Sequence, residues 1–129
     1  MNIFGIGTDI INISRIKKSL KSNRRLKKKN FTNYEINACE KRKNKTECYA
    51  KRFAAKEALF KAIRTDGVLK FQDVEVRNDK NGAPAFNIKN SSKIKLKKKF
   101  KKKKYKIFLS LSDDKPWAVA TAIIFVNSK

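Results

Sequence analysis

The sequence predicts a single α+β domain in which an antiparallel sheet packs with helices, one of them long and central. Two observations support this class. Helical patterns dominate residues 12–63, whereas residues 71–126 contain short apolar runs that are separated by turn signals. Turns that reverse the chain should make the strands they connect antiparallel. A chain of 129 residues has room for one hydrophobic core, so residues 1–129 are treated as one domain.

The first element is predicted to be a strand, because side chains in residues 3–11 alternate between two kinds. We expect the face with bulky apolar side chains to pack in the core. We expect the other face, which has two glycines and a carboxylate, to be bare. The first face comprises Phe4, Ile6 and Ile10, and the second comprises Gly5, Gly7 and Asp9.

Two helices are indicated after this strand. Apolar residues recur at helical spacing in residues 13–20, directly after Asn12, and the positions between them are basic. This pattern is typical of a basic amphipathic helix. Thr32 and Glu35 have the spacing of a capping box, which marks the start of the second helix.

The strongest helical signal lies in residues 49–63, where alanine and leucine form a small-residue packing stripe. We expect Gly67 to end this helix. Phe71, Val74 and Val76 are expected to begin β structure.

The remaining chain predicts two hairpins. Residues 81–82 are Asn-Gly, a strong turn signal between two short apolar runs. Residues 105–111 alternate, residues 113–116 turn, and residues 117–126 return as a buried strand. In residues 93–106, 10 of 14 side chains are lysine, and we expect a solvated helix or strand whose apolar positions touch the core.

Charge is the most unusual property of the composition. The chain has 34 Lys and Arg against 11 Asp and Glu, a formal net charge of +23. Such a charge attracts polyanions, which include nucleic acid, anionic lipid, phosphorylated small molecules and acidic proteins. Only 7 of the 34 cations are Arg, the residue best suited to grip phosphate. A bias in amino-acid composition and a basic binding surface therefore explain most of the lysine residues equally well.

Cys39 and Cys48 are the two cysteines, and the chain has no histidine. Too few ligands remain for a zinc finger, and we expect two reduced thiols rather than a disulfide. The longest mostly apolar run, residues 117–126, is about half the roughly 20 residues of a membrane helix. With no signal segment at the start, we expect a cytoplasmic protein without a membrane partner.

Asp9 and Glu57 are the two carboxylates that we consider as candidates for a chemical role. Asp9 follows two glycines on its strand face, which would leave room for a ligand, although a turn Asp that caps the next helix explains it equally well. Glu57 forms an ordinary helical pair with Lys61, but Arg52 and Arg64 also lie on this helix. A carboxylate among cations that meets a second carboxylate would suit Mg²⁺ shared with substrate phosphates.

Four segments, in this order along nearly the whole chain, resemble the holo-[acyl-carrier-protein] synthase family, the short bacterial 4'-phosphopantetheinyl transferases. They are Gly-Ile-Gly-Thr-Asp-Ile at 5–10, Arg-Phe-Ala-Ala-Lys-Glu-Ala at 52–58, Asn-Gly-x-Pro at 81–84 and Leu-Ser-Leu-Ser at 109–112. Each segment alone is a weak signal. The first two together, one on a strand and one on a helix, are specific.

The resemblance implies a transfer of the phosphopantetheine arm from coenzyme A to a serine of apo-acyl carrier protein, with release of adenosine 3',5'-bisphosphate. Asp9 and Glu57 match the family's carboxylates that hold Mg²⁺, which would stabilise charge on the leaving phosphate. Lys61 matches a lysine that contacts the pyrophosphate. The serine needs a base, and either Glu57 or a metal-bound water could serve.

Other matches imply how coenzyme A is held. Arg52 matches an arginine that grips the 3'-phosphate, and Arg42 would assist it. Asn81 and Pro84 fall where the family's turn lies against the adenine, although a plain hairpin turn explains both equally well.

The chain departs from the family pattern at three places. Phe60 replaces a small hydroxyl residue that precedes the lysine in many relatives. Arg-Thr-Asp at 64–66 replaces a common Gly-Thr-Gly, so a backbone contact to phosphate is in doubt. Asp113 stands where many members have histidine, so no imidazole role carries over.

The resemblance also implies architecture and partners. It implies a 4'-phosphopantetheinyl transferase-like α+β fold and a homotrimer with active sites shared between subunits. Arg15 matches the arginine that docks the acidic helix of acyl carrier protein, with Lys18 and Arg24 nearby. The alternative is a small basic nucleic-acid-binding protein of ribosomal type that uses residues 93–106. Such a binder has no need for the two carboxylates, so we expect no nucleic-acid partner.

Overall fold

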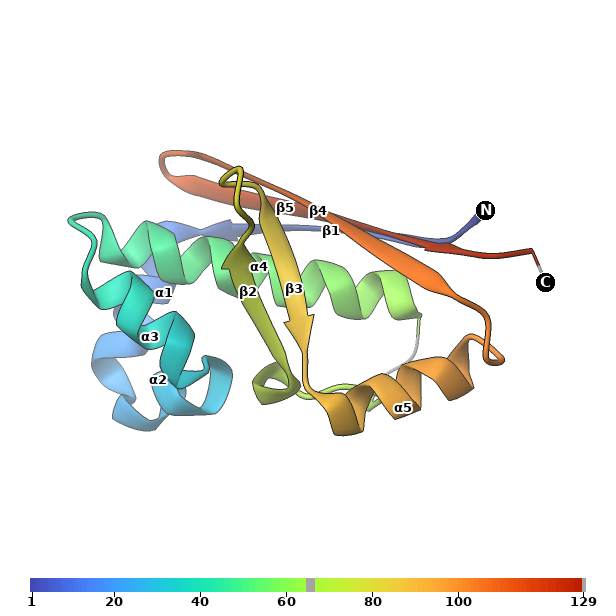
Figure 1. Ribbon diagram of the computed structural model, residues 1–129. Helices are drawn as coiled ribbons and strands as arrows, with labels where there is room; N and C mark the ends of the chain where they lie inside the picture. Colours follow the sequence, from blue (N-terminus) through green and yellow to red (C-terminus); the bar gives the residue numbers. More distant parts are fainter. Residues whose placement is uncertain (65–66, 129) are drawn as a thin grey trace.

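The computed structural model describes residues 1–64 and 67–128 and confirms the α+β class (Figure 1). The helices are α1 (Ile13–Ser22), α2 (Arg24–Asn30), α3 (Asn33–Glu40), α4 (Lys45–Ile63) and α5 (Asn90–Lys99), with a 3-10 turn η1 (Phe71–Asp73). The strands are β1 (Asn2–Asn12), β2 (Val74–Asn78), β3 (Pro84–Ile88), β4 (Tyr105–Asp114) and β5 (Trp117–Val126).

Two antiparallel sheets flank the long helix α4. The larger has the order β1-β5-β4, and the smaller is the β2-β3 hairpin. Figure 1 shows α4 running along the three-stranded sheet, with α1, α2 and α3 gathered at its N-terminal end. The α5 helix lies toward the end of the molecule where both termini emerge. None of the helices in these two described ranges combines the length and apolar character that a membrane span needs.

The prediction about which face of β1 packs was wrong for Ile6 and Ile10, although Phe4 packs against the core. Gly5 and Gly7 are buried because α4 crosses them at backbone contact: a Cβ on Gly5 would lie 2.0 Å from the carbonyl oxygen of Ala62, and one on Gly7 1.9 Å from that of Ala58. The glycines therefore allow α4 to pack closely on β1, and they do not leave room for a ligand. Ile6 is 64% exposed on the opposite face of the strand.

The outer face of the larger sheet is open and largely apolar, apart from a row of hydroxyl residues formed by Thr8, Thr121 and Ser110, and we call it the open sheet face. Ile123 on the central strand lies opposite Ile6 on one side and Phe108 on the other. Ile10 pairs with Val119 further along the same face. The open sheet face thus comprises Ile6, Ile10, Phe108, Val119, Ile123 and Phe125.

Helix positions confirm most expectations and correct some. The capping box is present: Thr32 and Glu35 each accept a hydrogen bond from the other's backbone nitrogen. The α4 helix begins at Lys45 and ends at Ile63, with Arg64 in the left-handed conformation at φ 70°, so Gly67 does not cap it. The sequence pattern missed α2, whose residues are all at least partly exposed.

The first half of the lysine-rich segment, residues 93–99, is helical, and its last two residues begin β4. Leu96 on α5 is fully buried and Phe100 just after it is 3% exposed, so these apolar positions reach the core as expected. Ile94 is 70% exposed and does not. Phe71, expected in β structure, lies in η1 because the chain makes one 3-10 turn before β2.

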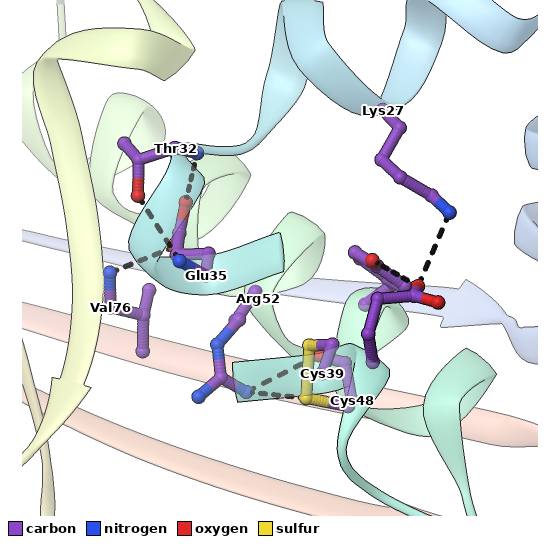
Figure 2. The surroundings of a disulfide bond; sticks show 9 residues. Lys27, Thr32, Glu35, Cys39, Cys48, Arg52 and Val76 are labelled. Atoms are coloured by element: carbon purple, nitrogen blue, oxygen red, sulfur yellow. Dashed lines mark hydrogen bonds and ion pairs between the residues drawn. A yellow bond between two sulfur atoms is a disulfide. The ribbon is translucent and has the colours of Figure 1, made fainter. Parts of the chain in front are cut away.

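The expectation of two reduced thiols was also wrong. Cys39 on α3 and Cys48 on α4 form a disulfide, with Cα atoms 5.5 Å apart and no exposed surface (Figure 2). This separation is typical of bridged cysteines. The sequence spacing of nine carries no such information, since it is the packing of α3 against α4 that brings the residues together.

Candidate functional site

A groove of about 590 Å³ lies between α1, α2 and α4, at the end of β1. Asp9, Arg15 and Glu57 are its charged lining residues. The remaining walls are largely apolar and include Ile11, Ile16, Leu20, Leu26, Phe31, Phe53 and Phe71. A larger hollow of about 860 Å³ lies over the lysine-rich segment, but no carboxylate of the described residues lines it. The smaller groove is therefore the better candidate for chemistry.

Asp9 and Glu57 come together here from two elements that the glycines of β1 bring into contact. Burial raises the pKa of Glu57 above its ordinary value, and the nearby negative charge of Asp9 raises it further. The pKa of Glu57 is partly lowered again by the positive charge of Lys61. The two carboxylates are therefore close enough to repel each other.

Lys61 joins this pair from the next turn of α4. Its Nζ donates hydrogen bonds to the Thr8 carbonyl at 2.9 Å and to Oδ1 of Asp9 at 3.3 Å. The Lys61 side chain is 55% exposed, so its ammonium remains open to an incoming anion. The structure thus unites the three residues that the sequence assigned to catalysis.

The donor set fits a magnesium ion that is shared with a substrate. Mg²⁺ commonly takes one or two protein carboxylates and completes its shell with phosphate oxygens and water. Residues 1–64 and 67–128 contain no cluster of three or more histidine, cysteine, aspartate or glutamate side chains that could enclose a metal alone. A cation would also offset the repulsion between Asp9 and Glu57.

Of the three expected partner-docking cations, Arg15 alone lines the groove. Lys18 is exposed on the same helix, α1. Arg24 is exposed at the start of α2, which forms another wall. Two helices that line the groove, α1 and α2, therefore each carry exposed basic side chains.

Arg52 does not join Asp9 and Glu57 within one chain. It is 4% exposed and lies outside the groove, where it donates to Sγ of Cys48 at 3.0 Å (Figure 2). Burial lowers the pKa of its guanidinium, and the like charge of Arg42 lowers it further. Within the part of the chain that the structure describes, its Nε is buried without a hydrogen-bond partner.

The other matched positions lie outside the groove as well. Asn81 sits in the β2-β3 turn, where its backbone nitrogen donates to Oδ1 of Asp79 at 2.8 Å, and Pro84 opens β3. Asp113 forms an ion pair with Lys51 at 3.1 Å. Thr65 and Asp66, part of one departure from the family pattern, lie outside the described residues.

Sequence reasoning missed Lys56, which is fully buried beside the groove and paired with Glu35 at 2.6 Å. Burial lowers the pKa of its ammonium, while the charge of Glu35 opposes that shift. Its position in the sequence could have indicated a buried charge, because Lys56 interrupts the alanine stripe of α4. A charged side chain on that buried stripe needs a partner.

Comparison with known proteins gives a consistent result. The model of the 4'-phosphopantetheinyl transferase superfamily matches residues 5–122. The holo-[acyl-carrier-protein] synthase of Pelagibacter ubique (strain HTCC1062) is 46% identical over 126 residues, which cover 96% of this chain and 98% of that protein.

Solved structures agree. Holo-ACP-synthase from Plasmodium yoelii superposes with a TM-score of 0.82 at 34% identity, covering 99% of this chain and 98% of that one. A holo-(acyl-carrier-protein) synthase from Bacillus anthracis in complex with CoA (3',5'-ADP) superposes with a TM-score of 0.78 at 35% identity, covering 98% of each chain.

Proposed function

Since the chain belongs to the 4'-phosphopantetheinyl transferase superfamily and is a phosphopantetheinyl transferase, we propose that it is a magnesium-dependent enzyme that moves phosphopantetheine from coenzyme A to a serine of apo-acyl carrier protein. Adenosine 3',5'-bisphosphate is the second product. The observation that carries the proposal is that Asp9 and Glu57 line one groove and that Lys61 forms an ion pair with Asp9.

The reaction is a phosphoryl-group substitution. The serine oxygen attacks the β-phosphorus of coenzyme A, and the bond from that phosphorus to the bridging oxygen breaks. The bridging oxygen leaves with the electron pair as part of adenosine 3',5'-bisphosphate. Mg²⁺ held by Asp9 and Glu57 would neutralise the pyrophosphate and stabilise the charge that develops on it.

The chain's own residues supply binding, orientation and proton transfer. The ammonium of Lys61, held by Asp9, is placed to face a pyrophosphate oxygen and to oppose leaving-group charge. The serine proton would pass to Glu57 or to a water beside it, the two candidate bases at this end of the groove. Arg15 orients the acidic partner together with Lys18 and Arg24.

We assign the 3'-phosphate to Arg52 with Arg42, and the adenine to the turn with Asn81 and Pro84. The unpaired Nε of Arg52 in the described chain and the like charge of Arg42 support an anion at that place. Neither Arg52 nor Arg42 lines the groove that contains Glu57. The proposal therefore includes a homotrimer, in which each active site is shared between subunits.

The open sheet face supports such self-association. It presents exposed isoleucine and phenylalanine side chains across three strands, an apolar patch of the kind that marks protein interfaces. A second chain that covers this face could bring its Arg52 toward the groove of the first. We place the reaction in the cytoplasm, with no nucleic acid and no membrane as partner.

The test is a mass measurement. Wild-type protein, coenzyme A, Mg²⁺ and an apo-acyl carrier protein should yield a carrier heavier by one phosphopantetheine, and a chelator should prevent this. Asp9→Ala and Glu57→Ala should abolish the product while circular dichroism stays native. Asp114→Ala, an exposed carboxylate at the end of β4, is the matched control and should remain active. Absence of product from the wild type would overturn the proposal and favour the nucleic-acid-binding alternative.

A further inference from the structure

Lys56 is a fully buried ammonium that uses all three of its protons. Its Nζ donates to Oε1 of Glu35 at 2.6 Å, to the carbonyl of Asn30 at 2.8 Å and to the carbonyl of Phe71 at 3.0 Å. The first acceptor balances its charge. The other two are backbone groups, one at the C-terminal end of α2 and one in η1.

Glu35 is equally well satisfied. Its Oε1 also accepts from the backbone nitrogen of Thr32 at 3.0 Å, and its Oε2 accepts from that of Val76 at 2.9 Å (Figure 2). Replacing a buried ion pair by apolar residues is often neutral or stabilising, so stability alone does not account for this pair. The distinctive property of the pair is the set of backbone groups that it fixes.

The α2 helix depends on such polar contacts because none of its residues is buried. Lys56 holds the carbonyl of Asn30, and the side-chain amide of Gln72 donates to the carbonyls of Lys28 and Phe31. These tethers all fasten the last residues of α2 and the residue that follows it.

The tethered groups are walls of the groove. Leu26 and Asn30 line it from α2, and Phe31 and Phe71 line it next to the Lys56 contacts. The amide of Gln72 fastens the same stretch from the residue next to Phe71. The Lys56 ammonium, which lies behind these walls, therefore fixes the position of α2 relative to η1 on this side of the groove.

We propose that Lys56, with Glu35, is a positioning residue that ties α2 to η1 and so keeps the groove for the carrier protein preformed. This inference rests on the proposed function for the identity of the ligand. Lys56 contacts neither Asp9 nor Glu57 through a hydrogen bond in the described chain, so its loss should impair carrier binding and leave the chemical step and coenzyme A binding intact.

The main variant is the double substitution Lys56→Met with Glu35→Leu, which removes both charges and leaves neither one buried alone. Hydrogen exchange should become faster in residues 24–31 and stay unchanged in α4 and β5. If only about a tenth of molecules keep the groove formed, the KM for carrier protein should rise about tenfold. The kcat and the KM for coenzyme A should stay within about twofold.

The second variant is Gln72→Ala, which removes an exposed amide and two tethers but no buried charge. It should give a smaller change of the same kind. If residues 24–31 keep wild-type exchange in the double variant, or if protection falls equally in α4 and β5, the positioning role is refuted. If the double variant does not fold, Lys56→Gln takes its place, and wild-type exchange of residues 24–31 in that variant refutes the role. Hydrogen exchange needs no substrate. A protein without transferase activity would therefore refute the proposed function, while its exchange rates would still test the positioning role of Lys56.

Discussion

Lys61 and Asp9 link the long helix to the first strand: Nζ of Lys61 lies 3.3 Å from Oδ1 of Asp9, and the same ammonium binds the Thr8 carbonyl. Glu57 lies one turn earlier on α4. Asp9 therefore pairs with the ammonium while Glu57 has no such ion pair in the described chain, and the two neighbouring carboxylates suit a divalent cation.

The first prediction concerns the pKa of Glu57 in the metal-free protein. Asp9→Asn removes a like charge, so the pKa of Glu57 should fall; Lys61→Met removes an opposite charge, so it should rise. Carbon-detected NMR titration of the Glu57 carboxyl measures both. Shifts in the same direction in the two variants would contradict the arrangement.

This pKa also has a consequence for stability. A carboxyl whose pKa is higher in the native state than its unfolded value of 4.5 stabilises the fold below that value, and this contribution is lost as pH rises through the native pKa. Asp9→Asn should reduce this loss. Urea unfolding of both proteins at pH 4 and pH 7 tests the sign.

The second prediction concerns the contact between β1 and α4. Gly7→Ala places a methyl group 1.9 Å from the carbonyl oxygen of Ala58, and neither backbone can yield without separating the two elements. We expect a loss of about 3 kcal/mol or more in the free energy of unfolding. Because Asp9 and Glu57 lie across this contact, turnover should fall as well.

Gly82→Ala is the matched control for Gly7→Ala. Gly82 has φ +83°, and apart from its chain neighbours no atom of the described residues would lie within 4 Å of an added Cβ. This change therefore costs only backbone strain, about 1–2 kcal/mol. Equal losses in the two variants would show that the close approach of α4 is unimportant.

The element types could be predicted because periodicity is local, as the capping box of Thr32 and Glu35 illustrates. The inward face of β1 could not be predicted in this way. The apolar side chains of β1 favoured the isoleucine face as the buried one. The alanine-lined helix α4 packs instead on the glycine face, because glycine allows the closest approach. The sequence of a strand does not show which element will pack on either of its faces. The helix α2 escaped detection because it buries nothing and has no apolar period.

The same distinction between local patterns and tertiary contacts applies to the residues of the candidate site. Asp9, Glu57 and Lys61 could be predicted because motif and spacing place them on adjacent elements, and the structure joins them. Lys56 and Glu35 meet across 21 residues, and Cys39 and Cys48 meet only through helix packing. Such contacts depend on tertiary structure, which a single sequence does not display.

The third prediction concerns the open sheet face. Ile6→Lys puts a charge at its centre, next to Ile123, and should convert the trimer we propose into monomers in sedimentation velocity experiments. Ile94→Lys is the control, since Ile94 is equally exposed but lies on α5. A wild type that sediments as a monomer, or an Ile6→Lys variant that stays associated, would refute this interface.

The fourth prediction concerns the basic rim of the groove. Arg15→Glu reverses a charge that lines the groove, so an acidic carrier should bind more weakly: its KM should rise roughly tenfold, mainly through a slower association rate. Added salt should narrow the difference from wild type, since salt screens exposed charges.

Lys95→Glu separates position from net charge. It changes the total charge of the protein by the same amount, but Lys95 lies exposed on α5, outside the groove. Long-range attraction by the whole +23 surface would make both variants equally slow. A specific docking role for Arg15 requires that only Arg15→Glu raises the KM for carrier protein, with the KM for coenzyme A unchanged in both. Because that outcome depends on one arginine among 34 cations, it also decides whether the lysine surplus contributes to recognition.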